Sequence, residues 1–183
     1  DVINHAVNYK GLPRRFHFMV NSVDWLYTRI RSGKEELDLE KSKFSNFVRS
    51  LDLRDGILRR SFVWHAPEGD IRIEFERLLS MVRPHVGLQR IVLYPESFSG
   101  TLEVCLGLDF STLQRNRGRC FWDTIRKGHL GNEAAIMART PKTGQKVFST
   151  MKISCSENAD VKDETGSQSI SDRKSTRLNS SHG

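Results

Sequence analysis

The segment "IRIEFERLL", residues 71–79, decides the fold class of this chain. Its apolar residues Ile71, Ile73 and Phe75 alternate with an arginine and two glutamates. A period of two places apolar side chains on one face of an extended chain, so the segment is predicted to be a half-buried β-strand. The preceding run "ILRRSFVW" (57–64) is rich in β-forming residues, and "HAPEGD" (65–70) supplies Pro and Gly between the two runs. Together they predict an antiparallel hairpin.

Similar segments recur along the chain and extend this prediction. Strands are expected at 16–20, 43–53, 88–95, 101–109, 133–140 and 146–154. The pair 88–95 and 101–109 is expected to form a hairpin around "ESFSG", and the last pair a hairpin around "PKTGQ". The one helix-like stretch is "EELDLEKS" (35–42). Turn signals come roughly every ten residues and strands do not alternate with helices, which predicts an all-β antiparallel β-sandwich.

The composition changes after Ser154, which divides the chain into three predicted parts. Residues 1–154 are expected to form an incomplete N-terminal sandwich, and the polar residues 155–171 a loop or the start of missing strands. Residues 172–183, "DRKSTRLNSSHG", are basic and rich in serine. Such a tail could bind nucleic acid or anionic lipid, or could be disordered. We favour a third interpretation, because one reverse translation of Asp172 to His182 resembles a sequencing-library adapter.

The charge pattern argues against a nucleic-acid partner, and the hydropathy argues against a membrane-spanning segment. The formal net charge is +7, but Arg and Lys are interleaved with acidic residues and do not form a continuous basic stripe. No window approaches the ~20 apolar residues that span a bilayer, and no stretch has the pattern of a secretion signal. A cytoplasmic location is therefore expected.

No residue pattern in the chain predicts a metal, a cofactor or a catalytic centre. Cys105, Cys120 and Cys155 are widely spaced and are expected to be idle thiols. The histidines lack the paired spacing of a zinc site, and neither a phosphate-binding loop nor a nucleophile elbow occurs. The acidic residues lie at predicted turns or on the polar faces of strands.

The three tryptophans leave two interpretations. Aromatic rings can stack on sugars, as in carbohydrate-binding sandwiches, but large aromatic side chains in a sandwich more often pack in the core. Packing in the core or between domains is the favoured prediction for Trp25, Trp64 and Trp122.

The middle of the chain resembles the N-terminal domain of glycoside hydrolase family 65. The resemblance lies in "FSNFVRSLDLRDGILRRSFVW" (44–64) and in "IRIEFERLLSMVRPHVGLQRIVLYPESFSGTLEV" (71–104). Within these segments the family pattern is matched by Leu51, Asp52, Gly56, Leu58, Arg60, Phe75, Glu76, Arg77, Ser80, Phe98, Ser99 and Gly100. The later "TPKTGQKVFSTMKIS" (140–154) also looks like a strand pair of the family.

This resemblance implies a large β-supersandwich joined through a helical linker to an (α/α)₆ barrel that holds the active site. Members cleave α-linked glucose disaccharides with inorganic phosphate as co-substrate and invert the anomeric centre, while some hydrolyse instead. A barrel glutamate would act as the general acid, so no catalytic, cofactor-binding or metal residue is carried over to this chain, which is expected to be inactive alone. The resemblance also implies a homodimer in the full-length protein.

What the resemblance does carry over is a structural role for seven residues. Asp52 and Gly56 are expected to shape a turn, and Arg60 and Arg77 to pair with buried or interface carboxylates. The set is completed by Leu51, Leu58 and Gly100.

Two functions from different classes remain open. One is the incomplete N-terminal domain of a glycoside phosphorylase or hydrolase; the other is a self-standing carbohydrate-binding module. A sandwich without its last strands would expose unpaired edges and apolar surface, so the fragment is expected to aggregate or to bind hydrophobic dyes.

Overall fold

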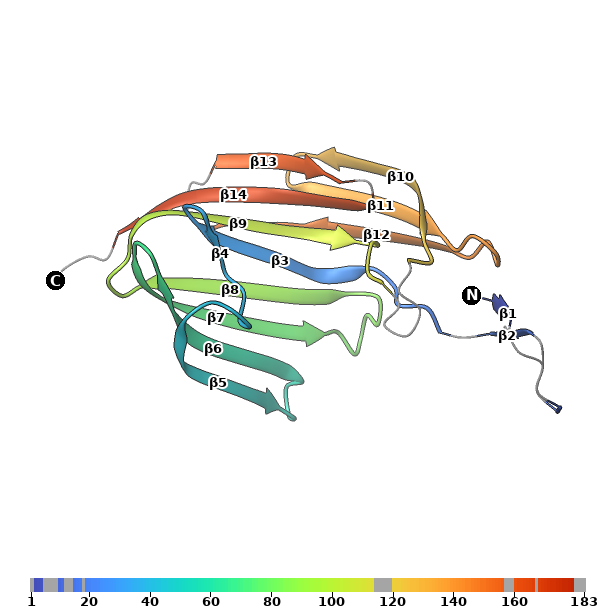
Figure 1. Ribbon diagram of the computed structural model, residues 1–183, viewed down its shortest axis with the longest axis horizontal. Helices are drawn as coiled ribbons and strands as arrows, with labels where there is room; N and C mark the ends of the chain where they lie inside the picture. The colour runs from blue at the N-terminus through green and yellow to red at the C-terminus, as the bar shows by residue number, and fades with distance from the viewer. Residues whose placement is uncertain are drawn as a thin grey trace. The chain divides into compact units, whose positions relative to one another are not determined.

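The structure is a computed structural model that describes residues 2–4, 10–11, 15–17, 19–113, 120–156, 160–166 and 168–179. The described residues form β-strands, turns and loops and contain no helix (Figure 1). The strands are β1 (Val2–Asn4), β2 (Arg15–His17), β3 (Asp24–Ser32), β4 (Glu35–Glu36), β5 (Phe44–Asp52), β6 (Ile57–Ala66), β7 (Gly69–Leu79), β8 (Gly87–Pro95), β9 (Ser99–Asp109), β10 (Asp123–Leu130), β11 (Glu133–Arg139), β12 (Lys146–Lys152), β13 (Asp160–Thr165) and β14 (Ser169–Asn179).

These strands form four sheets. Strands β1 and β2 pair with each other, and the other sheets have the orders β5-β6-β7-β8, β10-β11-β12 and β13-β14-β9-β3-β4. The pairs with a residue-by-residue register, such as β6 with β7, are antiparallel. The predicted all-β antiparallel sandwich class is thereby confirmed.

The chain divides into two compact units. Unit 1 comprises Asp1–Thr28, Cys105–Ser156 and Val161–Arg173, and unit 2 comprises Arg29–Val104, Glu157–Asp160 and Lys174–Gly183. Strands β3 and β9 each contribute residues to both units.

Unit 2 contains the strand that decided the fold class. The apolar face of β7 is buried as its alternation predicts, with Ile71 and Ile73 both fully buried. These side chains share one core with residues of β3 and β9, so two sheets bury their apolar faces against each other within this unit. The core consists of Ile30, Phe62, Trp64, Ile71, Ile73, Phe75, Phe98 and Leu102.

Unit 1 is built on the hairpins of β10, β11 and β12. Its core consists of Leu108, Phe110, Trp122, Ala134, Ile136, Ala138 and Ile170. The buried Trp122 donates a hydrogen bond from Nε1 to the carbonyl of Asn21 at 2.6 Å. Trp25 packs against the same core, while Trp64 belongs to the core of unit 2, so the tryptophans serve as core residues as predicted.

The expected hairpin of 88–95 and 101–109 is wrong. Strand β8 pairs with β7, whereas β9 lies between β14 and β3 in the five-stranded sheet. The loop between them is tied to the start of β7, because the amides of Glu96 and Ser97 donate to the carbonyl of Asp70 at 2.9 and 3.2 Å. Phe98 then enters the core with no exposed surface. The chain therefore crosses from one sheet to the other at a segment whose composition equally suits a hairpin turn.

The short helix-like stretch at 35–42 is not helical in the structure. Residues Glu35–Glu36 form the short strand β4, and turns follow. The Asp38 carboxylate accepts a hydrogen bond from the amide of Glu40 at 3.0 Å, and its carbonyl accepts one from Lys41 at 2.9 Å. Aspartate disfavours a helix interior because it offers the backbone this alternative partner.

Two smaller expectations concern the ends of the chain. The strand expected at 16–20 is represented by β2, which ends at His17, and Phe18 lies outside the described residues. Strand β14 runs through the predicted boundary between residues 171 and 172. The adapter origin of the last residues is a statement about nucleotides and stays a prediction, which resequencing the gene tests.

Candidate functional site

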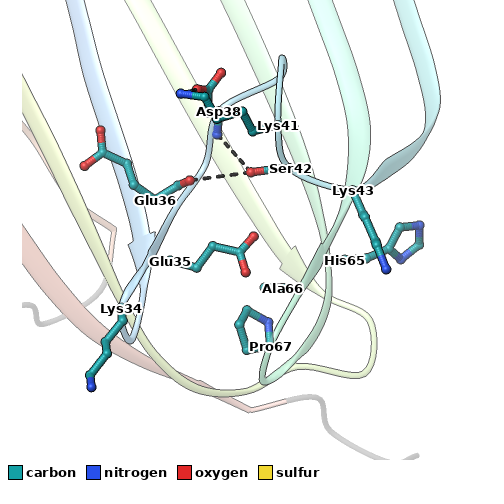
Figure 2. Close-up of a pocket in the computed structure, with 10 residues that line it drawn as sticks. All are labelled: Lys34, Glu35, Glu36, Asp38, Lys41, Ser42, Lys43, His65, Ala66 and Pro67. Carbon is teal, nitrogen blue, oxygen red and sulfur yellow. Dashed lines mark hydrogen bonds and ion pairs between the residues drawn. The ribbon is translucent and has the colours of Figure 1, made fainter.

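A hollow of about 730 Å³ opens in unit 2 between the segment that follows β3 and the β6–β7 turn (Figure 2). Figure 2 shows Glu35 directed toward Ala66 and Pro67, while the ring of His65 lies to the side of them. The hollow is lined by Lys34, Glu35, Glu36, Asp38, Lys41, Ser42, Lys43, His65, Ala66 and Pro67.

The carboxylates of this hollow already have partners within the chain. Glu36 accepts a hydrogen bond from Arg31 at 2.7 Å, and Glu35 accepts one from the indole of Trp64 at 3.4 Å. The hydrogen bond and charge of Lys41 lower the pKa of Asp38, which favours the ionised form. A glycosidic general acid needs the opposite shift, so Asp38 lacks the property that such catalysis requires.

A second polar cluster lies on the outer face of the β5-β6-β7-β8 sheet. The Nδ1 atom of His65 is 2.8 Å from Oδ1 of Asp70, and its Nε2 atom is 2.9 Å from Oγ of Ser45. Ser45 lies beside a β-bulge in β5, where Asn46 has a φ of 53°. His65 and Asp70 are cross-strand partners in the β6–β7 hairpin, so their contact follows from the hairpin register. The contact between His65 and Ser45 depends on the bulge in β5, which no sequence pattern predicts.

We expect this serine to be structural and not nucleophilic. The side chains of His65 and Asp70 are 40% and 43% exposed, so water solvates the groups that would have to activate Ser45. Covalent catalysis gains most from fixed donors in a water-excluded site. Incubation with a fluorophosphonate probe, followed by mass spectrometry, should leave Ser45 unlabelled, and Ser45→Ala should cost about 1 kcal/mol of stability. Stoichiometric labelling of Ser45 that His65→Gln abolishes would contradict this expectation.

The residues singled out from the sequence fall into three places in unit 2. Asp52 accepts hydrogen bonds from the amides of Arg54 and Asp55 at 3.0 and 3.3 Å, and these bonds are the main reason that its pKa is lowered. Gly56 follows with a φ of 67°, a conformation that suits glycine in the β5–β6 turn. Gly100 lies elsewhere, close to the ring of Phe98.

The remaining four residues lie together on the inner face of the β5-β6-β7-β8 sheet. The strand registers define two neighbouring cross-strand rows on this face. One row is Arg49, Arg60, Phe75 and Ile91, and the next is Leu51, Leu58, Arg77 and Gln89. We call the surface formed by Arg49, Leu51, Leu58, Arg60 and Arg77 the arginine face. Arg49 was not selected from the sequence, and only the register of β5 against β6 brings it opposite Arg60.

The electrostatics of this face are unusual. The guanidinium carbons of Arg60 and Arg77 lie 4.3 and 5.7 Å from the centre of the Phe75 ring. Arg77 donates from Nε to Oε1 of Gln89 at 2.8 Å, whereas the buried Nε of Arg60 has no hydrogen-bond partner among the described residues. Burial lowers the pKa of Arg60, and the charges of Arg77 and Arg49 lower it further.

The opposite face of the same strand differs sharply. Arg59 pairs with Glu76 at 3.1 Å and with Asp52 at 3.5 Å, and Arg90 also reaches Glu76 at 3.3 Å. These partners raise the pKa of Arg59, while the hydrogen bonds from Arg59 and Arg90 lower that of Glu76. The adjacent residues Arg59 and Arg60 of β6 therefore differ: Arg59 is paired with carboxylates on the outer face, whereas Arg60 lies beside other arginines on the inner face.

Other kinds of site have little support among the described residues. The described part of the chain holds no group of three His, Cys, Asp or Glu residues placed to bind a metal ion. Cys105, Cys120 and Cys155 are free thiols. No helix in the described ranges has the length and apolar character needed to cross a bilayer. The geometry defines a domain of the β-sandwich class.

The chain belongs to glycosyl hydrolase family 65, because the model of that family described as "Glycosyl hydrolase family 65, N-terminal domain" matches residues 4–181. It is 28% identical over 138 residues to maltose phosphorylase of Bacillus subtilis, which covers 72% of this chain and 18% of that protein. It is 27% identical over 110 residues to alpha,alpha-trehalose phosphorylase of Thermoanaerobacter brockii, which covers 60% of this chain and 14% of the relative.

A solved structure agrees with the sequence comparisons. The structure named "Putative kojibiose phosphorylase from human microbiome" superposes with a TM-score of 0.88 and 28% sequence identity, over 98% of this chain and 23% of that one. The chain thus spans less than a quarter of the length of these relatives. The family expected from residues 44–104 is confirmed.

Proposed function

We propose that this chain is the N-terminal domain of a glycoside phosphorylase that cleaves an α-linked glucose disaccharide by inverting phosphorolysis. The observation that carries the proposal is the family match over residues 4–181. The curated relatives, which include a trehalose and a maltose phosphorylase, support phosphorolysis over hydrolysis. Inorganic phosphate is then a co-substrate, and no further cofactor is proposed. A cytoplasmic homodimer is the corresponding proposal for the whole enzyme.

The chemistry would take place outside the described residues. Inverting cleavage needs an acid that protonates the leaving oxygen while the nucleophile attacks the opposite face of the sugar. In the described hollow, Asp38 is held ionised by Lys41, and Glu35 and Glu36 are occupied by Trp64 and Arg31. We therefore assign the general acid and the phosphate site to polypeptide that this chain does not contain.

A self-standing carbohydrate-binding module is less well supported by the site. Two of the three tryptophans are too buried to stack on a sugar, since Trp64 is fully buried and Trp122 is 6% exposed. Within the described residues the tryptophans are thus used for packing.

Assays of phosphorolysis and of glucan binding distinguish the two proposed functions. The chain alone is expected to release no β-glucose 1-phosphate from maltose, trehalose, kojibiose or nigerose in the presence of phosphate, and to show no saturable binding to immobilised α-glucan. An exchange enzyme, in which this chain replaces the matching segment of the Bacillus subtilis maltose phosphorylase, should phosphorolyse maltose. Saturable glucan binding by the chain alone, together with an inactive but folded exchange enzyme, would favour the binding module.

A further inference from the structure

The arginine face brings three positive charges together on one patch of sheet. Arg49 and Arg60 are direct cross-strand partners, and Arg77 lies in the next row. Like charges placed directly opposite each other in a sheet are destabilising. Among the described residues no ion pair joins Arg49 or Arg60 to a carboxylate, although the other face of β6 has such pairs. The repulsion between Arg49 and Arg60 is therefore not compensated by a carboxylate within the described chain.

The buried nitrogen of Arg60 makes the lack of compensation costly. Its Nε atom is inaccessible to solvent and has no hydrogen-bond partner among the described residues. A buried donor without a partner loses its hydration and gains nothing in return. The guanidinium carbon lies 4.3 Å from the centre of the Phe75 ring, a cation–π contact that orients the charged group.

Apolar side chains surround the arginines. Phe47, Leu51 and Leu79 are 45%, 57% and 63% exposed. Arginines that lie among exposed aromatic and aliphatic side chains are typical of protein interfaces. A free inorganic anion could neutralise the charge but would leave this apolar surface in water. A second copy of the same face would place its own arginines against these, and like-charge repulsion disfavours that pairing.

We propose that the arginine face binds a polypeptide surface that places an Asp or Glu carboxylate against Arg60, between Arg49 and Arg77, with aliphatic side chains against Leu51. This inference rests on the proposed function, since the partner is assigned to the part of the enzyme outside the matched domain. The carboxylate would receive charge-assisted hydrogen bonds from a planar guanidinium, the geometry in which arginine differs most from lysine.

The first experiment uses the chain alone, at a dilution where light scattering shows it to be monomeric, and does not depend on its proposed activity. The arginine Nε–Hε resonances are followed by NMR while acetate, inorganic phosphate or chloride is added at constant ionic strength. We expect acetate to shift the Arg60 resonance saturably and to leave that of Arg59 unchanged. No saturable shift at Arg60, an equal response to chloride, or tighter binding of phosphate than of acetate would overturn the carboxylate assignment.

The second experiment compares Arg60→Met with Arg59→Met, two variants of adjacent residues on opposite faces of β6. In the chain alone, Arg60→Met should leave the melting temperature unchanged or raise it, because it removes the repulsion, whereas Arg59→Met should lower it slightly. In the exchange enzyme the order should reverse, and Arg60→Met should lower the melting temperature more than Arg59→Met does. A loss of stability in the chain alone that is larger for Arg60→Met than for Arg59→Met would overturn the proposal.

The two experiments also keep the inference separate from the proposed function. If the exchange enzyme is folded but inactive, the proposed function fails while the melting comparison still tests the arginine face. If the exchange enzyme does not fold, the NMR titration and the melting temperatures of the chain alone still test the proposal for the arginine face.

Discussion

Replacing Trp64 with alanine is expected to lower the free energy of unfolding by about 3–5 kcal/mol, the usual cost of truncating a large buried aromatic side chain. Trp64 has no exposed surface and lies in the core that joins the two sheets of unit 2. The substitution also removes the indole N–H that hydrogen-bonds Glu35. Urea denaturation followed by far-UV circular dichroism measures the change without relying on the deleted fluorophore.

Tyr94→Ala provides the matched control for this substitution. Tyr94 is a large aromatic residue of the same sheet, but it is 37% exposed and its ring lies 4.0 Å from the guanidinium of Arg72 on the outer face. Its removal should cost about 1 kcal/mol, because little buried surface is lost. Equal losses for the two variants would mean that Trp64 does not occupy the core.

Substituting Gly69 with alanine is expected to cost about 3 kcal/mol or more, through backbone strain added to overpacking. Gly69 has a φ of 123°, and an added Cβ would lie 2.5 Å from the carbonyl oxygen of Ser97 and 2.8 Å from Cα of Phe98. Both contacts are with backbone atoms of the loop that carries the chain from β8 to β9. The loop cannot move away without breaking its hydrogen bonds to Asp70.

Gly56→Ala separates the effect of the crossing loop from the effect of a positive φ. Gly56 has a φ of 67°, and nothing lies within 4 Å of the position of its added Cβ. Its substitution should therefore cost about 1–2 kcal/mol, the penalty of a left-handed conformation alone. The difference in urea midpoint between the variants measures the close approach at Gly69. If Gly56→Ala lowered the free energy of unfolding as much as Gly69→Ala, the close approach of the β8–β9 loop to Gly69 would be contradicted.

Several elements of the fold could be predicted because their determinants are local. The alternation of Ile71, Ile73 and Phe75 specifies a buried face whatever strand lies beside it, and the structure buries all three. The turn at "PKTGQ" likewise joins β11 and β12 as expected. Side-chain direction in a strand has a period of two, so sequence order alone assigns each residue to a face.

The candidate site could be predicted only in part. The family resemblance selected Arg60 and Arg77. It could not show that both guanidinium groups lie over the ring of Phe75, nor that Arg49 is the cross-strand partner of Arg60. The contact between Ser45 and His65 depends on the bulge in β5 and was not predicted. These relations join residues on different strands, and pairing registers are set by the whole sheet.

By itself, the sequence determined the strand class, the alternating faces and the family of this protein. Only the tertiary structure decided that β8 and β9 lie in different sheets, that Asp38 forms a turn within a helix-like stretch, and that three arginines meet on one face. The physical reason is the range of the interactions. Periodicity and turn chemistry act over a few residues, whereas sheet pairing, burial and charge repulsion depend on which distant residues the core brings together.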